Sequence, residues 1–226
     1  MSGPDGRVRI AVLDYGMGNR RSVVKALEHV GARAESTSDP ERLRGADGVV
    51  VPGVGAFPLA MANLRELGLE ARLRAIAGEG TPLLGICLGM QLLFERSDEL
   101  EPTDGLGLLT GSVTRLRSGG LRVPHIGWNE VSFERPSPLT EGLPAQGCPF
   151  YHVHSLVARP ADPADVVASA VYGERFATIV ARGSVYGVQF HPEKSSAHGL
   201  RMLQSFVDRC RGAAAPARPV AATTTT

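Results

Sequence analysis

The N-terminal half of the chain alternates short apolar runs with helical patterns, and this alternation restricts the chain to few folds. The runs at Val8–Leu13, Gly48–Val51 and after Pro82 lack a polar alternate face, and a further short strand is expected at Ala32–Thr37. Apolar residues at helical spacing fill the intervening segments 23–30, 58–68 and 69–76. Strands that are apolar on both faces and alternate with helices predict a parallel sheet covered by helices on both sides.

The residue pattern changes after about Asp104, where glycines become frequent and apolar residues alternate with polar ones. Strands are expected at 113–116, 128–133, 150–157, 166–172, 178–181 and 185–189. Several of them should be antiparallel additions to the same sheet, and Gly199–Arg209 has the apolar spacing of a closing helix. We therefore expect one α/β domain over residues 8–210, with a mixed, mostly parallel central sheet flanked by helices. The segments 1–7 and 212–226 are expected to be disordered tails.

Charge and cysteine content exclude several classes of function. The formal net charge of +1 gives no reason to expect nucleic acid or an anionic membrane as a partner. The three cysteines form no Cys-x-x-Cys pair, which argues against a disulfide framework or a zinc site and favours a reducing compartment. The start is polar and no apolar run reaches spanning length, so we expect a cytoplasmic protein. Neither a P-loop nor a G-x-G-x-x-G motif is present, and we expect no metal and no cofactor.

One stretch, Pro82–Gln91, combines a buried strand with the start of a helix. Between them lies Gly85-Ile86-Cys87-Leu88-Gly89, a cysteine version of the sharp strand-to-helix turn called a nucleophile elbow. Glycines are needed on both sides because the backbone is strained and the helix packs closely on the strand. The turn presents the side chain of Cys87 at the carboxyl edge of the sheet, where free N–H groups favour the thiolate.

Two other segments supply what a nucleophilic cysteine needs. His191-Pro192-Glu193 follows the late strand 185–189, where a parallel sheet would place a base beside the elbow. A carboxylate at Glu193 can hold the imidazole in one tautomer. The segment Pro52-Gly53-Val54-Gly55 ends a neighbouring strand and can turn backbone N–H groups toward a developing oxyanion, with the N–H of Leu88 as the second donor.

These residues resemble a known family. Gly85–Gln91 together with His191–Glu193 is similar to the class I, triad-type glutamine amidotransferases. Four further stretches resemble one branch of that class, the glutaminase subunits of imidazole glycerol phosphate synthase (HisH), and His191–Ser195 supports the same branch. These stretches are Asp14–Asn19, Pro52–Phe57, His125–Asn129 and Phe150–Ser155. The resemblance runs from about Val8 to about Cys210 and implies a single α/β domain with a mixed sheet.

The resemblance implies a reaction and a set of site residues. Cys87 attacks the side-chain amide of glutamine, His191 carries the proton and Glu193 orients His191, giving glutamate and ammonia. The oxyanion donors fall on the backbone N–H groups of Val54 and Leu88. The residues that match the glutamine-binding positions are Gly53, Gly55, Gln91, Glu99, His154, Ser155 and Leu156.

A partner is expected on two grounds. Ammonia at neutral pH is mostly protonated and not nucleophilic, so it must pass directly to an acceptor site, and this chain has length for one domain only. In the family the acceptor lies on the cyclase subunit HisF, a (β/α)₈ barrel that forms a heterodimer with the glutaminase. It converts a phosphoribulosyl-formimino nucleotide to imidazole glycerol phosphate and an aminoimidazole carboxamide ribotide. Asn19, Trp128 and Lys194 match positions near that interface.

Two alternatives stay open at this point. The same chemistry could serve another acceptor, as in the pyridoxal phosphate or para-aminobenzoate amidotransferases, or the chain could be a non-catalytic regulatory protein with a relic triad. The remaining cysteines, Cys148 and Cys210, are expected to be packing or exposed thiols. The histidines His125, His152 and His154 are expected to be too scattered for a metal site, and His29 and His198 to be solvated or structural residues.

Overall fold

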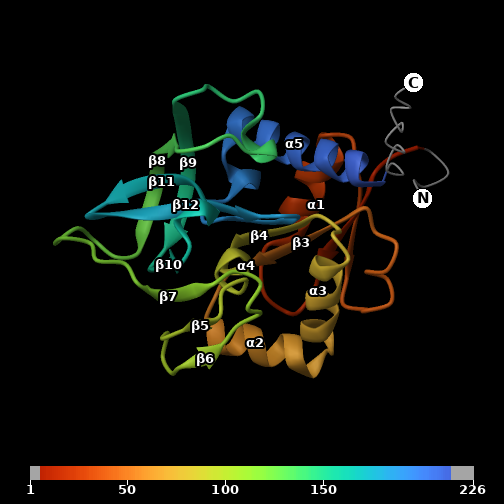
Figure 1. The fold of residues 1–226 in the computed structure, drawn as a ribbon, viewed down its shortest axis with the longest axis horizontal. Helices are drawn as coiled ribbons and strands as arrows, with labels where there is room; N and C mark the ends of the chain where they lie inside the picture. The colour runs from red at the N-terminus through yellow and green to blue at the C-terminus, as the bar shows by residue number, and fades with distance from the viewer. Residues whose placement is uncertain (1–5, 215–226) are drawn as a thin grey trace, which may run out of the picture.

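The computed structural model describes residues 6–214, and a nine-stranded sheet runs through their centre in the order β2-β1-β3-β4-β13-β12-β11-β8-β9 (Figure 1). Its first five strands are parallel: β2 (Arg33–Thr37), β1 (Arg9–Leu13), β3 (Gly48–Gly53), β4 (Leu83–Cys87) and β13 (Val185–Val188). The other four are antiparallel: β12 (Glu174–Arg182), β11 (Val166–Tyr172), β8 (His125–Phe133) and β9 (Gly147–His154). The mixed α/β fold is confirmed, with as many antiparallel pairings as parallel ones.

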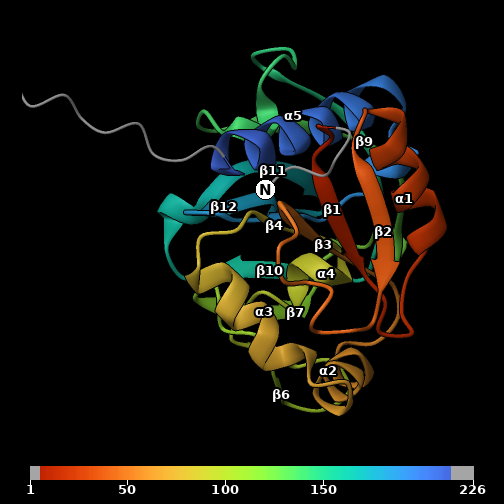
Figure 2. The same cartoon turned by 90° about the vertical axis from the view of Figure 1, so that its right-hand side faces the viewer.

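Helices cover both faces of the parallel strands, as the apolar runs predict (Figure 2). On one face α1 (Arg20–His29) and α5 (Ser196–Ala214) pack on one side of β1, β3 and β4, in a core that contains Leu27, Val50 and Phe206. On the other face α2 (Phe57–Glu66) and α3 (Leu69–Gly78) pack in a second core, with Met61 and Leu73. The central strand β3 is buried at every position, which explains why its sequence shows no polar alternate face.

A small second sheet lies beside the helix pair α2 and α3, in the order β10-β7-β5-β6 (Figure 1). It consists of β10 (Leu156–Pro160), β7 (Gly111–Arg115), β5 (Arg96–Ser97) and β6 (Thr103–Asp104). The predicted strand 150–157 is wrong as one element, because the chain bends at Ser155 and divides into β9 and β10. This bend lets one segment serve both sheets, and it lies next to the site described below.

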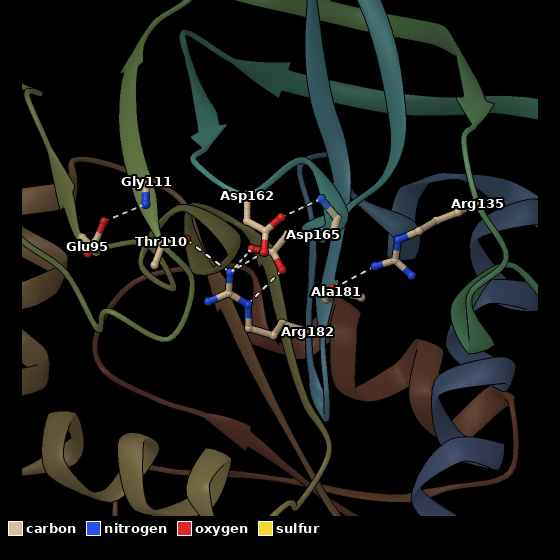
Figure 3. A network of polar contacts seen from close by, with 9 residues as sticks. Glu95, Thr110, Gly111, Arg135, Asp162, Asp165, Ala181 and Arg182 are labelled. Atoms are coloured by element: carbon tan, nitrogen blue, oxygen red, sulfur yellow. Dashed lines mark hydrogen bonds and ion pairs between the residues drawn. The ribbon is translucent and has the colours of Figure 1, made fainter.

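The junction between the two sheets is fixed by Arg182 at the end of β12 (Figure 3). Its guanidinium donates to Asp165 at 2.9 and 2.7 Å and to Thr110 at 3.2 Å, just before β7. The Asp165 side chain is almost completely buried. A bidentate, partly buried pair of this kind holds geometry more firmly than an exposed ion pair.

Several element boundaries differ from the sequence expectation. Apolar residues at helical spacing continue from Leu88 to Phe94, which favours a longer helix, but α4 comprises Leu88–Gln91 only and the chain then turns. Strand β12 is longer than the expected 178–181. Residues 212–214, assigned to the disordered tail, are the last residues of α5. Of the other expected tail residues, Gly6 and Arg7 precede β1 in neither a helix nor a strand, and 1–5 and 215–226 lie outside the described residues. Within 6–214, no helix combines the length and the apolar character needed to cross a membrane.

Candidate active site

Cys87 lies at the turn between β4 and α4, and its backbone is in an unusual region, with φ 55° and ψ −110°. A non-glycine residue takes such a conformation only where the surrounding structure imposes it. The glycines on either side explain how the turn is held. A Cβ atom on Gly89 would lie 1.7 Å from the carbonyl oxygen of Val51, and one on Gly85 would lie 2.5 Å from that of Gly89. Helix α4 therefore packs directly on the backbone of β3 and β4.

His191 follows β13, the strand that pairs with β4, and its Nδ1 lies 2.9 Å from Oε1 of Glu193. Both side chains are buried. With Nδ1–H directed to the carboxylate, Nε2 is left for the thiol. Burial alone would lower the pKa of His191, but the hydrogen bonds to Cys87 and Glu193 outweigh it and raise the pKa to about 10. The raised pKa means that the site favours the protonated form of His191.

The backbone around His191 is fixed by two further hydrogen bonds. Its N–H donates to the carbonyl of Tyr151 at 2.9 Å, and its own carbonyl accepts from Ser195 Oγ at 2.7 Å. The same Oγ accepts from the N–H of Tyr151 at 3.0 Å. Ser195 therefore connects the loop 191–195 to β9, a role that the sequence did not indicate beyond its place in the His191–Ser195 motif.

The glycine-rich segment lies against Cys87, because Gly53 and Cys87 are register partners in the β3–β4 pair. Tyr15, fully buried, donates its hydroxyl to the carbonyl of Pro52 at 2.8 Å. A Cβ on Gly53 would lie 2.4 Å from that hydroxyl oxygen. Burial, and then the charge of Cys87, raises the pKa of Tyr15, so its hydroxyl stays protonated and remains a donor.

A cavity of about 230 Å³ opens beside Cys87. It brings together Cys87, His191 and most of the residues that the resemblance assigned to glutamine and to the oxyanion. Its lining consists of Val54, Gly55, Cys87, Leu88, Gln91, Glu99, Val153, His154, Ser155, Leu156, His191 and Lys194. Glu193, which contacts His191, and Gly53, the last residue of β3, are not among the residues that line the cavity. Lys194, assigned to the partner interface, lies at the cavity and is exposed.

Glu99 has a second role that the sequence did not indicate. Its Oε2 accepts a 2.6 Å hydrogen bond from the N–H of Phe57, the first residue of α2. The carboxylate thus caps a helix that has no side-chain cap of its own. This contact fixes Glu99 at the edge of the cavity.

Two glutamines, Gln91 and Gln189, connect the backbone at the cavity wall to the sulfur of Cys87 through hydrogen bonds. Gln91 donates Nε2 to the carbonyl of Leu156 at 3.3 Å and to Oε1 of Gln189 at 3.1 Å. Gln189 in turn directs its Nε2 at Cys87 Sγ, 3.7 Å away. From its sequence position, Gln189 is only the last residue of an expected strand, because the direction of its amide depends on how the sheet is paired.

The expectation that His125, His152 and His154 are scattered is wrong. The rings of His125 and His152 stack with centroids 5.1 Å apart, and those of His125 and His154 meet edge to face at 5.0 Å. All three are buried, and burial is the main cause that lowers the pKa of each, that of His154 to about 4. Their ring nitrogens are engaged in hydrogen bonds, and no group of three His, Cys, Asp or Glu side chains within 6–214 could hold a metal ion. The remaining cysteines, Cys148 and Cys210, are free and buried.

The two other interface residues lie outside the cavity. Asn19 is exposed and caps α1, its Oδ1 accepting from the N–H of Ser22 at 3.4 Å. Trp128 on β8 is 54% exposed and Ile126 beside it is 59% exposed. The indole of Trp128 packs edge to face on Tyr151, with centroids 6.1 Å apart.

The site combines a cysteine in a strand-to-helix elbow, a histidine paired with a carboxylate and an adjacent cavity, on a mixed α/β sheet. We compared the chain with known proteins to find the class that has this arrangement. A family profile described as glutamine amidotransferase class-I matches residues 11–210. A solved structure titled "Crystal structure of glutamine amidotransferase" superposes with a TM-score of 0.71 at 24% identity, covering 90% of this chain and 98% of that one. The chain belongs to the class I glutamine amidotransferases.

Two curated relatives narrow the assignment. The HisH subunit of imidazole glycerol phosphate synthase from Moorella thermoacetica is 51% identical over 90% of this chain and 96% of its own length. The HisH subunit from Methylococcus capsulatus is 52% identical over 88% of this chain and 95% of its own length. Within its class, the chain is a member of the HisH family.

Proposed function

We propose that this chain hydrolyses glutamine through the triad Cys87, His191 and Glu193. The observation that carries the proposal is the strained elbow at Cys87 beside a buried histidine that is paired with a carboxylate at 2.9 Å. The sulfur attacks the amide carbon, and the imidazolium of His191 gives its proton to the departing nitrogen. Ammonia leaves and a thioester forms, after which His191 takes a proton from water and glutamate is released.

We further propose that the backbone N–H groups of Val54 and Leu88 bind the oxyanion. Both residues line the cavity, and Val54 directly follows Gly53, the register partner of Cys87. Gly55, Gln91 and the backbone of His154–Leu156 form the walls that hold glutamine. The carboxylate of Glu99 lies at the same cavity and suits the substrate ammonium.

We also propose that the chain is one of the two subunits of a synthase. Its relatives are named as subunits of imidazole glycerol phosphate synthase, and the described residues form a single α/β fold. Ile126 and Trp128 form an exposed apolar surface on β8, and such surfaces with aromatic residues are typical of protein interfaces. We propose a cytoplasmic heterodimer with the barrel cyclase HisF, in histidine biosynthesis, with Asn19, Trp128 and Lys194 near the contact.

Glutamate release tests this function. The full chain is assayed with glutamine alone, with the cyclase, and with the cyclase and its nucleotide ligand. Release that rises when the cyclase and its nucleotide are both present supports the proposal. Absence of release with a cyclase that is competent with ammonium would refute it.

A further inference from the structure

We propose that Asn129, His125 and His154 form a relay of hydrogen bonds that positions Leu156, one wall of the cavity. His125 and His154 are then positioning residues for the substrate. The identity of that substrate rests on the proposed function, whereas the relay itself is a property of the fold. The relay joins β8, which carries the exposed Trp128, to the bend between β9 and β10.

The direction of each hydrogen bond follows from the end of the relay at the cavity. His154 Nδ1 lies 2.9 Å from the carbonyl oxygen of Leu156, which can only accept, so Nδ1 carries the proton. A neutral imidazole then has a bare Nε2, and that atom lies 2.9 Å from His125 Nδ1. His125 must therefore be protonated on Nδ1, which leaves its own Nε2 to accept from Asn129 Nδ2 at 3.4 Å.

Burial and packing keep this arrangement neutral and rigid. His125 and His154 are 3% and 5% exposed, and burial lowers the pKa of both rings. The ring of His125 stacks on Tyr172 at 4.0 Å with an interplanar angle of 22°. Asn129 is held from its other side, because its Nδ2 also donates to the carbonyl of Val171 at 3.0 Å. Neither ring can turn over without leaving a buried polar atom unpaired.

The relay ends where the substrate cavity begins. The carbonyl of Leu156 accepts from His154 Nδ1 and also from Gln91 Nε2, at 2.9 and 3.3 Å. Gln91 continues through Gln189 to the sulfur of Cys87. The Leu156 carbonyl is therefore the point at which support from β8 meets the residues around the nucleophile. Loss of the relay should loosen one cavity wall without removing a reacting group.

The tautomers can be measured without any enzymatic activity. Nitrogen-15 NMR of the histidine rings in the full chain at neutral pH is expected to show His125 and His154 neutral and protonated on Nδ1. A proton on Nε2 of either ring would overturn the relay. This measurement stands even if the chain proves not to hydrolyse glutamine, which is decided separately by the glutamate-release assay of the wild-type complex.

A pair of His125 variants tests the positioning role. His125→Phe keeps the stack on Tyr172 but removes the Nδ1 donor, and it should raise KM for glutamine about fivefold with kcat within twofold, as expected for one lost hydrogen bond. His125→Asn returns a donor near the Nδ1 position and should recover most of the loss. An unchanged KM in a folded His125→Phe, or no recovery with His125→Asn, would contradict the proposal.

Thr178→Val is the matched control. It removes the 2.9 Å hydrogen bond to Nε2 of His152, an equally buried ring of the same cluster that lies outside the relay. It should lower the melting temperature and leave KM unchanged. A rise in KM equal to that of His125→Phe would mean that any damage to the cluster disturbs the cavity, and would refute a specific relay.

Discussion

Buried polar side chains around Cys87 each form a hydrogen bond, because an unpaired polar group is costly inside a protein. The hydroxyl of Tyr15 is the clearest case, since it is fully buried, touches the carbonyl of Pro52 and lies beside the elbow. It fixes the peptide that immediately precedes Gly53 and Val54, the segment proposed to bind the oxyanion. A defect there should therefore affect the chemical step as well as stability.

We expect Tyr15→Phe to lower the free energy of unfolding by about 1 kcal/mol, because it leaves the buried Pro52 carbonyl unpaired. It should also lower kcat for glutamine with the cyclase about fivefold. Tyr172→Phe is the control, because the Tyr172 hydroxyl donates to the carbonyl of Arg122 at 2.8 Å on the surface. Steady-state kinetics and chemical denaturation of both variants check this. Equal kcat values in the two would contradict a role for Tyr15 in the oxyanion segment.

At the scale of elements, the elbow depends on the close approach of α4 to β3. The Gly89 position leaves no room for a Cβ atom, since that atom would lie 1.7 Å from a backbone oxygen that cannot move without breaking the sheet. The requirement comes from packing rather than from backbone dihedrals, because Gly89 is not among the glycines with positive φ.

Gly89→Ala should lower the free energy of unfolding by several kcal/mol or abolish folding, as overpacked cores do. Gly78→Ala makes the matched comparison, because Gly78 lies at the end of α3 and an added Cβ would meet nothing within 4 Å. There we expect a gain of up to about 1 kcal/mol. Thermal melts of the two variants decide the matter, and a well-folded Gly89→Ala with an unchanged melting temperature would contradict the close packing.

The parallel half of the sheet could be predicted from sequence because its strands are buried on both faces and its turns contain glycine. The bend at Ser155 could not be predicted, because the residues 150–157 alternate as one continuous strand does. The division becomes visible only when β10 is seen to pair in the second sheet. The short α4 was missed for a similar reason: Leu92, Leu93 and Phe94 are buried in a turn, where apolar spacing looks helical.

The candidate site was predictable where a residue type is rare and its spacing is diagnostic. Cys87, His191 and Glu193 fulfil both conditions. The contacts of Tyr15, Gln189 and the histidine cluster depend on which side chains meet across the sheet. His125 and His154 are register partners in the β8–β9 pair, a relation that requires knowledge of the pairing. The double role of Glu99, at the cavity and at the start of α2, likewise joins segments that are distant in the sequence.

At the scale of the whole molecule, the buried histidines make stability depend on pH. The folded pKa of His154, about 4, lies below the ordinary value of 6.5, so the unfolded chain binds a proton that the folded chain excludes. The stability from neutral His154 is complete above pH 6.5 and is lost as pH falls toward 4.

We expect the free energy of unfolding to fall by about 3 kcal/mol between pH 6.5 and 4 through His154. Chemical denaturation at several pH values, compared with the variant His154→Asn, isolates this share from that of the carboxylates. The variant should show a shallower acid loss. Identical pH slopes in the two proteins would show that His154 is not the source.

The surface on β8 should bind the second subunit. Trp128→Ala is expected to weaken binding of the cyclase by about tenfold or more, since exposed aromatic residues are common hot spots of interfaces. Leu100→Ala, at a residue 87% exposed, is the control and should leave binding unchanged. Titration calorimetry of the two variants with the cyclase measures this, and equal affinities would exclude Trp128 from the interface.

The central claim is that Cys87 releases ammonia which the partner consumes, and a single variant tests it most directly. The complex of Cys87→Ala with the cyclase is assayed for product formation, once with glutamine and once with ammonium as the nitrogen source. We predict that synthesis from glutamine is abolished while synthesis from ammonium is retained at the wild-type rate. Retained synthesis from glutamine, or loss of both activities in a folded complex, would contradict the account.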